Sequence, residues 1–452
     1  MAHPHPCCAF AVAILTLALT ACGASAPSPP FTPPVPSQSA SEAPTGFDSK
    51  SNGVVNDSTH DADRTAFDEV EDIGDGLGPL YNAQSCRECH QNPTSGGPSQ
   101  ISELRVGHLG PDGRFRNPDI PIGRGTVVIS GRTLVNDRAI CPDAAFPDSE
   151  IQERVPDTET IRTTRLALNL LGDGLVEAVP DSTMLALARE QRRATGGRIH
   201  GQAARVPILE APGQTGIGRF GWKDQHASLL SFAGDAYLNE MGITSRLFPE
   251  EVTDVCNTVS EPNNTPDSTG LEDIDRFTRF MRATKAPARD RVLAATAQAQ
   301  RGSELFDNIG CAVCHVRTLT TAPAGTAING GADTIPPALG DKVFHPFADF
   351  LLHDVGTGDG IAIAMVEHYG RNMYRIAWKD FDPDTILRAR NKVRTAPLWG
   401  VRLRPRLIHD GASLTLRDAI LRHREEAGAV THRFRRLAPS DQEALIEFLK
   451  SL

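Results

Sequence analysis

Apolar side chains recur every three or four positions in several stretches of the chain, which is the period of an amphipathic helix. The stretches with this spacing are residues 164–180, 224–241, 290–310 and 440–452. The last of them opens with Ser440 and Glu443 at the spacing of a capping box. Residues 123–135 predict a pair of strands, and residues 321–342 a loop rich in Gly and Pro. The pattern predicts a mainly α fold with minor β structure and long loops.

A shorter apolar stripe near the C-terminus contains a histidine. In residues 416–427, Leu416, Ile420, His423 and Ala427 fall on one face of a helix. Such a histidine is usually a core residue whose ring is hydrogen-bonded to a backbone carbonyl. The alternative is that its other nitrogen binds a metal. The stripe alone does not choose between these two roles.

An uncharged apolar run covers residues 9–21, too short to span a bilayer comfortably but of the length of a signal-peptide core. It ends in small residues directly before Cys22, which resembles the lipobox of bacterial lipoproteins. Residues 1–21 contain no Lys or Arg, so the usual positive start is missing. The sequence predicts a signal peptide over 1–21, a lipid on Cys22, and a lipid-tethered Pro/Ser-rich linker over 22–60.

The rest of the chain adds no second membrane signal. No later segment is apolar and long enough for a transmembrane helix, so we expect attachment to a membrane by the lipid anchor only. The expected location is the periplasmic side of a bacterial membrane. The formal charge of −10 argues against non-specific binding to nucleic acid, which needs a basic surface.

Two C-x-x-C-H motifs stand far apart in the chain. Their residues are Cys86, Cys89 and His90, then Cys311, Cys314 and His315. Two thiols three positions apart on one helical turn can each add to a haem vinyl group, and the adjacent histidine then binds the iron. A thioredoxin-like site needs a βαβ pattern that neither motif has, and a shared zinc site leaves both histidines unexplained. The sequence therefore predicts two covalently attached haem c groups.

Two further features have alternative interpretations. Cys141 and Cys256 could form a disulfide in an exported protein, although the sequence does not fix their distance. Residues 216–221 read G-x-G-x-x-G, and Glu240 follows about 20 residues later, as in a dinucleotide-binding loop. Because Pro212 interrupts the approach and no second βαβ unit follows, dinucleotide binding is the weaker interpretation.

Two haem domains are predicted from the placement of the helices. A helix leads into the second motif and another closes the chain, which resembles the arrangement of a class I cytochrome c domain. We therefore expect residues 288–452 to form one such domain with a long insertion. Residues 61–287 surround the first motif less regularly and are expected to form the first haem domain.

Several segments, taken in order between residues 66 and 452, resemble one family. They are GLGPLYNAQSCRECHQNPTSGG, LLGDGLVEAVP, GRFGWKDQHASL, EMGITSRLFP, LLHDVG, RTAPLWG and LIHDGASLTLRDAILRH. The chain resembles the bacterial di-haem oxidoreductase (thiol oxidoreductase-like) family, which is related to di-haem cytochrome c peroxidases. The resemblance implies a periplasmic protein in which one haem passes electrons and the other can meet a substrate. Where the family usually has His-Asp-Met-Gly, this chain has Val355 in place of the methionine.

The groups opposite the two proximal histidines decide the function, because a six-coordinate iron has no free position. In the related peroxidases a methionine follows the helix that comes after a His-Asp-Gly sequence, and this methionine ligates the electron-transfer haem. Here the His-Asp-Gly sequence is residues 409–411, and His423 occupies the place of the methionine. For the first haem, Met241 is a candidate iron ligand, with core packing as the alternative. Glu240 is a candidate acid or base, with a surface carboxylate as the alternative. Further candidates are His226, His353 and His409 near the irons, and Trp222, Trp378 and Trp399 as electron relays.

Two functions remain in competition. The leading hypothesis is an exported di-haem c-type cytochrome oxidoreductase, in which electrons pass through the His315 haem to a peroxidase-like site at the His90 haem. The alternative is a non-catalytic electron-transfer cytochrome with both haems six-coordinate. The expected partners are an electron-donor protein or a quinone pool, with a small molecule as substrate.

Overall fold

The computed structural model describes residues 1, 40–142, 146–253, 255–256, 259–362 and 389–452. Outside these residues lie residues 2–21 of the predicted signal peptide and residues 22–39 of the predicted linker, which include the predicted lipid site Cys22. Trp378 also lies outside them. No helix within the described ranges is long and apolar enough to cross a membrane. Helices make up 33% of the structure and strands 15%, so the prediction of a mainly α fold is not clearly confirmed.

The described helices and strands are short, and many are separated by loops. The helices are α1 Asp57–Asp68, α2 Cys86–Cys89, α3 Asp148–Ile151, α4 Asp173–Glu177, α5 Asp181–Ala194, α6 Leu229–Met241, α7 Asp273–Ala283, α8 Arg291–Ala294, α9 Ala297–Asn308, α11 Leu416–Arg422, α12 Gly428–Arg436 and α13 Pro439–Lys450. The strands are β1 Ser41–Glu42, β2 Leu80–Tyr81, β3 Ser102–Leu109, β4 Phe115–Arg116, β5 Ile120–Ile122, β6 Val127–Ile129, β7 Leu134–Val135, β8 Arg138–Ala139, β9 Ile161–Leu166, β10 Arg205–Pro207, β11 Thr215–Ile217, β12 Leu319–Thr320, β13 Ala327–Ile328, β14 Asp333–Thr334, β15 Lys342–Phe344, β16 Leu352–His353 and β17 Val393–Arg394.

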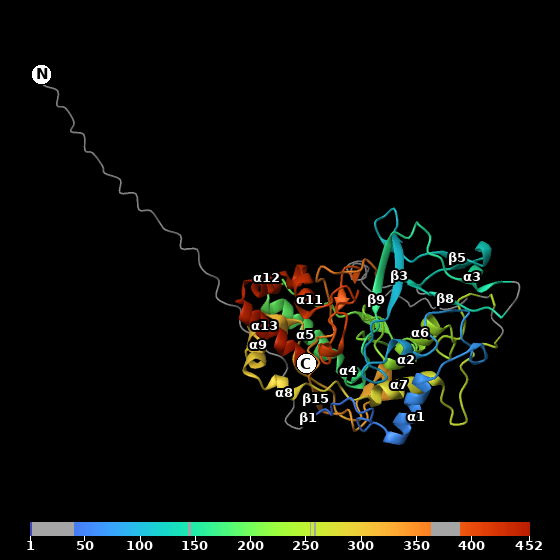
Figure 1. Ribbon diagram of the computed structural model, residues 1–452, viewed down its shortest axis with the longest axis horizontal. Helices are drawn as coiled ribbons and strands as arrows, with labels where there is room; N and C mark the ends of the chain where they lie inside the picture. Colours follow the sequence, from blue (N-terminus) through green and yellow to red (C-terminus); the bar gives the residue numbers. More distant parts are fainter. Residues whose placement is uncertain (2–39, 143–145, 254, 257–258, 363–388) are drawn as a thin grey trace.

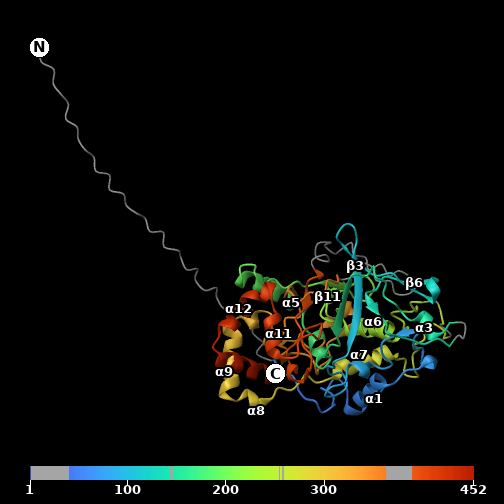
Figure 2. The same ribbon diagram turned by 45° about the horizontal axis from the view of Figure 1, so that its top comes forward.

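The molecule has a helical side and a strand-rich side. Helices α8, α9, α11, α12 and α13 gather on one side, and the long strands β3 and β9 lie on the other (Figure 1). The view turned by 45° keeps the C-terminal helices and β3 apart in the same way (Figure 2). The two C-x-x-C-H motifs are divided between these sides, since α2 lies near β9 and α6, whereas α9 leads into the second motif.

Strand β3 is the centre of a four-stranded antiparallel sheet with β4, β7 and β9. Its pairing with β9 runs from Ser102 opposite Leu166 to Gly107 opposite Ile161. The predicted helix over 164–180 is therefore wrong. Its first residues belong to β9, and only the short helix α4 follows, because pairing with a strand some 60 residues earlier outweighs the local helical spacing. Strands β6 and β7 do form within 123–135, but they pair with β5 and β3 rather than with each other.

Helix α6 lies within the predicted segment 224–241. It begins at Leu229, after Ser228 caps it by accepting a hydrogen bond from the Ser231 amide. It ends at Met241, and Gly242 follows in the left-handed region with φ of 75°. These caps fix the position of the last turn, which carries Glu240 and Met241.

The C-terminal helices differ in detail from the sequence expectation. The segment 290–310 contains two helices, α8 and α9, because Thr296 caps a new helix by accepting from the Ala299 amide. Helix α13 begins at Pro439, directly after the N-cap residue Ala438. The predicted capping box of Ser440 and Glu443 does not form, because the helix starts before Ser440.

Helices α9 and α13 cross at unusually close range. A Cβ atom on Gly302 would overlap the carbonyl oxygen of Ala444 and would lie 2.8 Å from the Cβ of Phe448. The rings of Phe306 and Phe448 meet next to this crossing, with centroids 5.3 Å apart. The helix before the second motif and the closing helix therefore pack against each other through a glycine.

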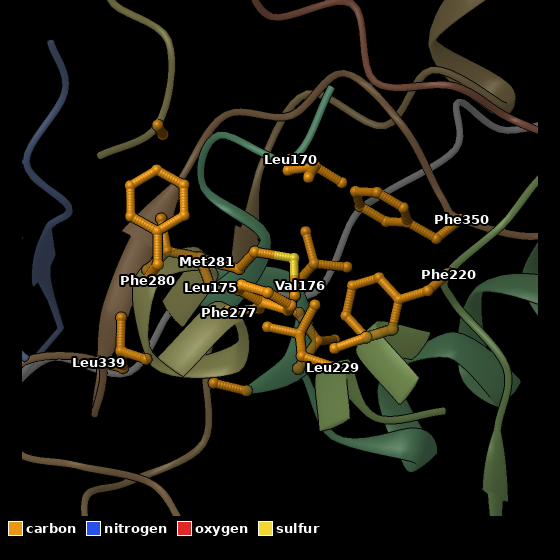
Figure 3. Close-up of a cluster of buried hydrophobic side chains, with 14 of the residues drawn as sticks. Leu170, Leu175, Val176, Phe220, Leu229, Phe277, Phe280, Met281, Leu339 and Phe350 are labelled. Atoms are coloured by element: carbon orange, nitrogen blue, oxygen red, sulfur yellow. The ribbon is translucent and has the colours of Figure 1, made fainter. Parts of the chain in front are cut away.

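Two large apolar clusters make the core. The larger one packs Phe277, Phe280 and Met281 of α7 against Leu175 and Val176 of α4 (Figure 3). It extends to residues 316–351 and to Trp399, so it draws on the chain on both sides of the predicted boundary at 287. The second cluster joins α9, α11, α12 and α13. The division into haem domains over 61–287 and 288–452 stays a prediction.

The N-terminal part of the described chain already belongs to the fold. Strand β1 pairs in parallel with β15, with Ser41 opposite Lys342. The side-chain amide of Asn52 donates hydrogen bonds to the carbonyl oxygens of Arg282 and Thr284. The predicted linker over 22–60 is therefore too long at its C-terminal end, because backbone and side-chain hydrogen bonds attach the chain from Ser41 onward.

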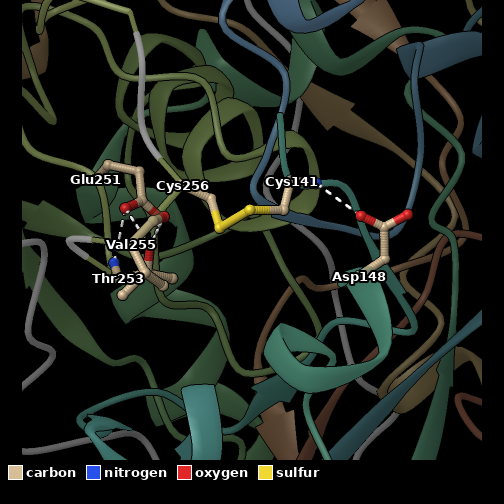
Figure 4. Close-up of a disulfide and its surroundings, with 6 residues drawn as sticks. All are labelled: Cys141, Asp148, Glu251, Thr253, Val255 and Cys256. Carbon is tan, nitrogen blue, oxygen red and sulfur yellow. Dashed lines mark hydrogen bonds between the residues drawn. A yellow bond between two sulfur atoms is a disulfide. The ribbon is translucent and has the colours of Figure 1, made fainter. Parts of the chain in front are cut away.

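The two cysteines outside the motifs form a disulfide. Cys141 and Cys256 are bonded, and their Cα atoms are 5.1 Å apart (Figure 4). The Cys141 amide also donates a hydrogen bond of 2.8 Å to Asp148 at the start of α3. The disulfide links the region before α3 to the segment that follows α6.

The G-x-G-x-x-G segment does not open a helix after a parallel strand. Its first residues lie in β11, which forms an antiparallel hairpin with β10. Arg219 in the segment donates hydrogen bonds to the carbonyl oxygens of Val176, Glu177 and Val179 at the end of α4. The segment is therefore a structural turn, in agreement with the weaker weight given to dinucleotide binding.

Candidate functional site

The first C-x-x-C-H motif opens into a large cavity. Ser85 caps the short helix α2 by accepting from the Glu88 amide, and this turn places Cys86 and Cys89 on one side. Both cysteines and His90 line a cavity of about 500 Å³, which we call the first cavity. Both thiols are free, and burial raises their pKa. The structure thus brings the three residues of the motif to one enclosed space.

The ring of His90 is held in one orientation. Its Nδ1 donates a hydrogen bond of 2.8 Å to the carbonyl oxygen of Leu168, which follows β9. Burial lowers the pKa of His90 to about 4, so the imidazole is neutral at physiological pH. A neutral ring with Nδ1 bonded to a carbonyl leaves Nε2 as the available metal-binding atom.

A polar cluster forms one wall of the first cavity. Glu240 is hydrogen-bonded to the carboxyl group of Glu103, and its Oε2 accepts a bond of 2.8 Å from Asn82. Arg105 donates to Glu103 at 2.6 Å and approaches Glu240 to 4.0 Å. Burial and the neighbouring charge of Glu103 raise the pKa of Glu240 well above its ordinary value. These opposite environments favour a proton on Glu240 and an ionised Glu103 when the pair holds a single proton.

Met241 and Tyr237 line the same cavity from α6. Met241 is buried and also belongs to the larger apolar cluster, so it has the contacts of a core residue. The Tyr237 hydroxyl donates a hydrogen bond of 2.9 Å to Glu71, and burial raises the pKa of Glu71 to about 7. The end of α6 thus supplies a carboxyl, a thioether and a phenol to one cavity.

The second C-x-x-C-H motif lines a separate and smaller cavity. Cys311, Cys314 and His315 face a space of about 180 Å³, which we call the second cavity. The Nδ1 of His315 donates a hydrogen bond of 3.0 Å to the carbonyl oxygen of Phe347. Burial lowers the pKa of His315 to about 4. Both motif histidines are therefore neutral, buried, and oriented by a backbone carbonyl.

His423 faces the same cavity as His315. Helix α11 ends at Arg422, so the predicted stripe is not one continuous helix, and Ala427 belongs to a separate turn. His423 and Ala427 nevertheless both line the second cavity. The Nδ1 of His423 donates a bond of 2.7 Å to the carbonyl oxygen of Ala419, and burial lowers its pKa. The centroids of the His423 and His315 rings are 6.5 Å apart.

Two polar side chains in the wall of the second cavity have buried nitrogen atoms without a partner among the described residues. The Arg404 guanidinium lines it, and its Nε and one Nη atom are buried without a hydrogen-bond partner in the described part of the chain. The Nδ1 of His409 is also buried without a hydrogen-bond partner among the described residues, and burial lowers the pKa of His409 to about 4. Such orphaned donors are costly in a closed structure and indicate that the cavity takes a group with acceptor atoms.

Trp222 is shared by both cavities. It is buried and lines each of them, and its indole Nε1 donates a hydrogen bond of 2.8 Å to the carbonyl oxygen of Leu166. The His409 ring lies edge-on to it at 6.0 Å between centroids. Trp399 instead packs in the larger apolar cluster against Phe344. Of the two tryptophans that the structure describes, Trp222 is the one between the cavities.

The remaining histidine candidates have structural partners. His226 lies 3.1 Å from Asp235. His353 is held between Asp349 and Glu426 at 2.8 and 3.0 Å, rather than by the following Asp354. These contacts attach His226 to helix α6 and strand β16 to the residues around it, although His353 also lines the second cavity.

The sequence did not reveal Glu103, Arg105, Asn82 and Arg404 as members of the two cavities. Glu103 and Arg105 alternate with apolar residues on β3, and this period of two would have placed both on one face of a strand. Their meeting with Glu240, however, depends on the packing of β3 near α6. No local pattern marks Asn82 or Arg404.

Comparison with known proteins gives the family. Residues 142–452 match the family described as "Di-haem oxidoreductase, putative peroxidase", and this range is more than half of the chain. The chain belongs to the di-haem oxidoreductase family. The matched range contains the second C-x-x-C-H motif, Glu240, Met241 and His423, whereas the first motif precedes it.

Solved structures show distant similarity to this di-haem oxidoreductase. Hydrazine synthase of Kuenenia stuttgartiensis is 14% identical, with 93% of this chain and 100% of that chain covered and a TM-score of 0.37. The diheme peroxidase BthA of Burkholderia thailandensis is 14% identical, with 85% and 86% covered and a TM-score of 0.29. A MauG-like protein associated with microbial copper homeostasis is 19% identical over 40% of this chain and 52% of that chain, with a TM-score of 0.23. A search of curated proteins finds no match.

The two haem groups that family membership implies fit the observed residues. Each cavity offers two free thiols and a neutral, oriented imidazole, which is the donor set of such a group. In the second cavity the rings of His315 and His423 both face the space, with 6.5 Å between their centroids, so these two residues would hold the iron there. The unpartnered Arg404 suits a haem carboxylate.

Proposed function

We propose that this di-haem oxidoreductase is an exported c-type cytochrome with peroxidase-like activity. Cys86 and Cys89 would hold one haem covalently, with His90 as iron ligand, and Cys311, Cys314 and His315 would hold the other. The bound haems supply one-electron chemistry. Electrons would enter at the His315 haem and pass to the His90 haem, where a small molecule would be reduced.

The observation that carries this proposal is the position of Trp222. Its indole lines the wall of both cavities, so an aromatic side chain stands between the two cofactor sites. Its hydrogen bond to Leu166 and its contact with His409 fix the ring in place. A relay between two sites needs such a fixed, shared group, whereas two independent sites do not.

The difference between the cavities supports the assignment of roles. Both motifs would hold the same cofactor, yet the first cavity measures about 500 Å³ and the second about 180 Å³. The larger size of the first cavity supports a substrate site beside the first cofactor. The second cavity is lined by His423, which would bind the iron of the His315 haem together with His315.

Glu240 is the proposed acid at the first cavity. Reduction of hydrogen peroxide to two waters consumes two electrons and two protons. The protonated carboxyl of Glu240 would give one proton to the departing oxygen, and the ionised Glu103 beside it would favour its reprotonation. Arg105 keeps Glu103 ionised, so the proton stays on Glu240 until it is needed.

The second candidate function is electron transfer without catalysis. The buried thioether of Met241 lines the first cavity, and it would close that site if it bound the iron. Both haems would then be six-coordinate. The protein would pass electrons between partners but would not reduce peroxide.

The proposed setting is the periplasmic side of a bacterial membrane, with the lipid on Cys22 as the anchor. The disulfide between Cys141 and Cys256 supports export, because such bonds persist in oxidising compartments. The electron source would be a donor protein or the quinone pool.

The decisive experiment is a spectral titration of the purified ferric protein. We expect one haem to be high-spin or to shift its Soret band on addition of cyanide, and the half-reduced protein to turn over hydrogen peroxide. The Glu240→Gln variant should bind cyanide normally but lose about 10²–10⁴-fold in peroxide turnover. Two low-spin haems that respond to neither ligand would establish the electron-transfer alternative.

His423 is tested by its own substitution. The His423→Ala variant should convert one of the two haems to high-spin, and added imidazole should restore the low-spin spectrum. Substitution of His226, which lies outside the second cavity, serves as the control. An unaltered spectrum in His423→Ala would remove this residue as a ligand.

A further inference from the structure

The segment that encloses the second cavity is strongly basic, in contrast to the rest of the chain. Residues 401–438 contain nine arginines and four carboxylates, although the whole chain has a formal charge of −10. The same segment supplies most of one wall of the second cavity. Its lining residues include Val401, Leu407, His423, Val430 and Thr431.

Helix α12 carries the densest part of this charge. Val430 and Thr431 face the second cavity, while Arg433, Arg435 and Arg436 of the same helix are exposed to solvent. In both views α12 lies at the outer edge of the C-terminal helices (Figures 1 and 2). The outer face of the wall of the second cavity is therefore positively charged.

Two exposed arginines of this segment contact residues next to the second C-x-x-C-H motif or in the wall of the second cavity. Arg433 donates a hydrogen bond of 2.5 Å to the carbonyl oxygen of Ile309, two residues before Cys311. On the neighbouring turn, exposed Arg424 donates its backbone amide to the carbonyl oxygen of Val355, which lines the second cavity. We call Arg424, Arg433, Arg435 and Arg436 the basic face.

The charges of the basic face are not neutralised by acidic side chains of the described chain. No ion pair joins any of these four arginines to an acidic side chain among the described residues. Three carboxylates on nearby elements are already paired: Asp441 with Arg301, Glu443 with Arg417, and Asp410 with Arg422. A helix C-terminus is stabilised by one or two cations, which does not account for a row of exposed arginines.

We propose that the basic face is the docking surface for an acidic electron-transfer protein that reduces the His315 haem. This inference rests on the proposed entry of electrons at the second cavity, and it adds where the donor binds and which charge it carries. Redox partners meet through small, short-lived interfaces, and complementary charge raises their rate of encounter. A donor on this face would be separated from the second cavity by the thickness of one helix wall.

The test is the rate at which a known acidic donor reduces the ferric protein. Reduced flavodoxin serves as the acidic probe, and the methyl viologen radical cation as a small cationic reductant. Each gives one electron to one ferric haem, and stopped-flow absorbance follows the reduction. The test variant is Arg435→Gln/Arg436→Gln, and the matched control is Arg114→Gln/Arg116→Gln, two exposed arginines beside β4 on the strand-rich side.

At low ionic strength, flavodoxin should reduce the test variant about 3–10-fold more slowly than the wild type. The difference should fade with added salt, because screening weakens the attraction. Methyl viologen should reduce wild type and variant equally fast or favour the variant. Equal flavodoxin rates for wild type and test variant, or an equal loss in the control variant, would overturn the proposal.

The main competing occupant is an anionic membrane surface. Vesicles of phosphatidylcholine and phosphatidylglycerol test it, using the chain without its lipid in a flotation assay. Binding that the test variant loses, together with unchanged flavodoxin kinetics, would assign the basic face to the membrane and overturn the proposal. None of these measurements uses peroxide turnover, so the peroxidase-like function and the docking surface can fail separately.

Discussion

Gly302 offers a sharp test of how the second motif is positioned. The Gly302→Ala substitution adds one methyl group at the crossing of α9 and α13. That carbon would lie 2.8 Å from the Cβ of Phe448 and would overlap the carbonyl oxygen of Ala444. Carbon atoms pack best at about 3.5–4.0 Å, so the two helices must separate by about 1 Å.

The magnitude follows from two opposing terms. Overpacking of this kind costs about 1–3 kcal/mol or more, and the separation also loosens the contact between Phe306 and Phe448. Alanine gains about 1 kcal/mol over glycine in helix propensity. We expect a net loss of about 1–2 kcal/mol in the free energy of unfolding, since the close overlap places the cost in the upper part of its range.

Gly428 provides the matched control. It is the first residue of α12, its backbone is helical with φ of −56° and ψ of −37°, and nothing lies within 4 Å of an added Cβ. Gly428→Ala should therefore stabilise the protein by about 0.5–1 kcal/mol. The two substitutions are chemically identical, and only the surroundings predict opposite signs.

Urea unfolding of the haem-loaded protein measures both effects, with circular dichroism for the helices and the Soret band for the cofactor sites. The Gly302→Ala midpoint should fall and the Gly428→Ala midpoint should rise slightly, at similar slopes. Equal midpoints for the two variants, or a Gly302→Ala protein as stable as the wild type, would refute the described helix crossing.

Three further outcomes are expected. Burial raises the pKa of Glu71 to about 7 and that of Asp173 to about 7, above the unfolded values, so stability should fall as pH rises from about 4.5 to 7. In urea titrations at several pH values, Glu71→Gln should reduce this fall in the free energy of unfolding by about 2–3 kcal/mol. The same pH dependence in the variant and the wild type would contradict a raised pKa of Glu71. Cys141→Ser should cost about 2–5 kcal/mol by releasing the link to Cys256, seen as a lower thermal midpoint, whereas no shift would show that the bond is not stabilising. Trp222→Phe should slow electron transfer between the haems severalfold in a flash-reduction experiment without changing either haem spectrum, and an unchanged rate would exclude it as the relay.

The sequence by itself determined the features that depend on local spacing. The C-x-x-C-H motifs need only one helical turn, so their residues and cofactor class are readable before any fold is known. Helices α6, α9 and α13 keep an apolar face over several turns, and each was expected near its observed position. The family resemblance also follows from short ordered segments.

Other features depend on partners that are distant in the chain. β9 has a helix-like apolar pattern, but it becomes a strand because β3 supplies a ladder of hydrogen bonds. The capping box at Ser440 fails for the reverse reason, since Pro439 starts the helix earlier than the pattern suggests. Local preference is worth a fraction of a kcal/mol per residue, and such contacts outweigh it.

The tertiary structure alone decided what each cavity contains. Glu103 and Glu240 are far apart in the chain, and only the packing of β3 near α6 brings their carboxyl groups into hydrogen-bond contact. His423 was singled out for its place in a helical stripe, yet the helix ends before it and the residue still faces His315. Trp222 could not be separated from Trp399 by sequence, because the position between two cavities is a property of the fold. Spacing along the chain specifies a cofactor, whereas the distance between groups in space specifies what the cofactor can do.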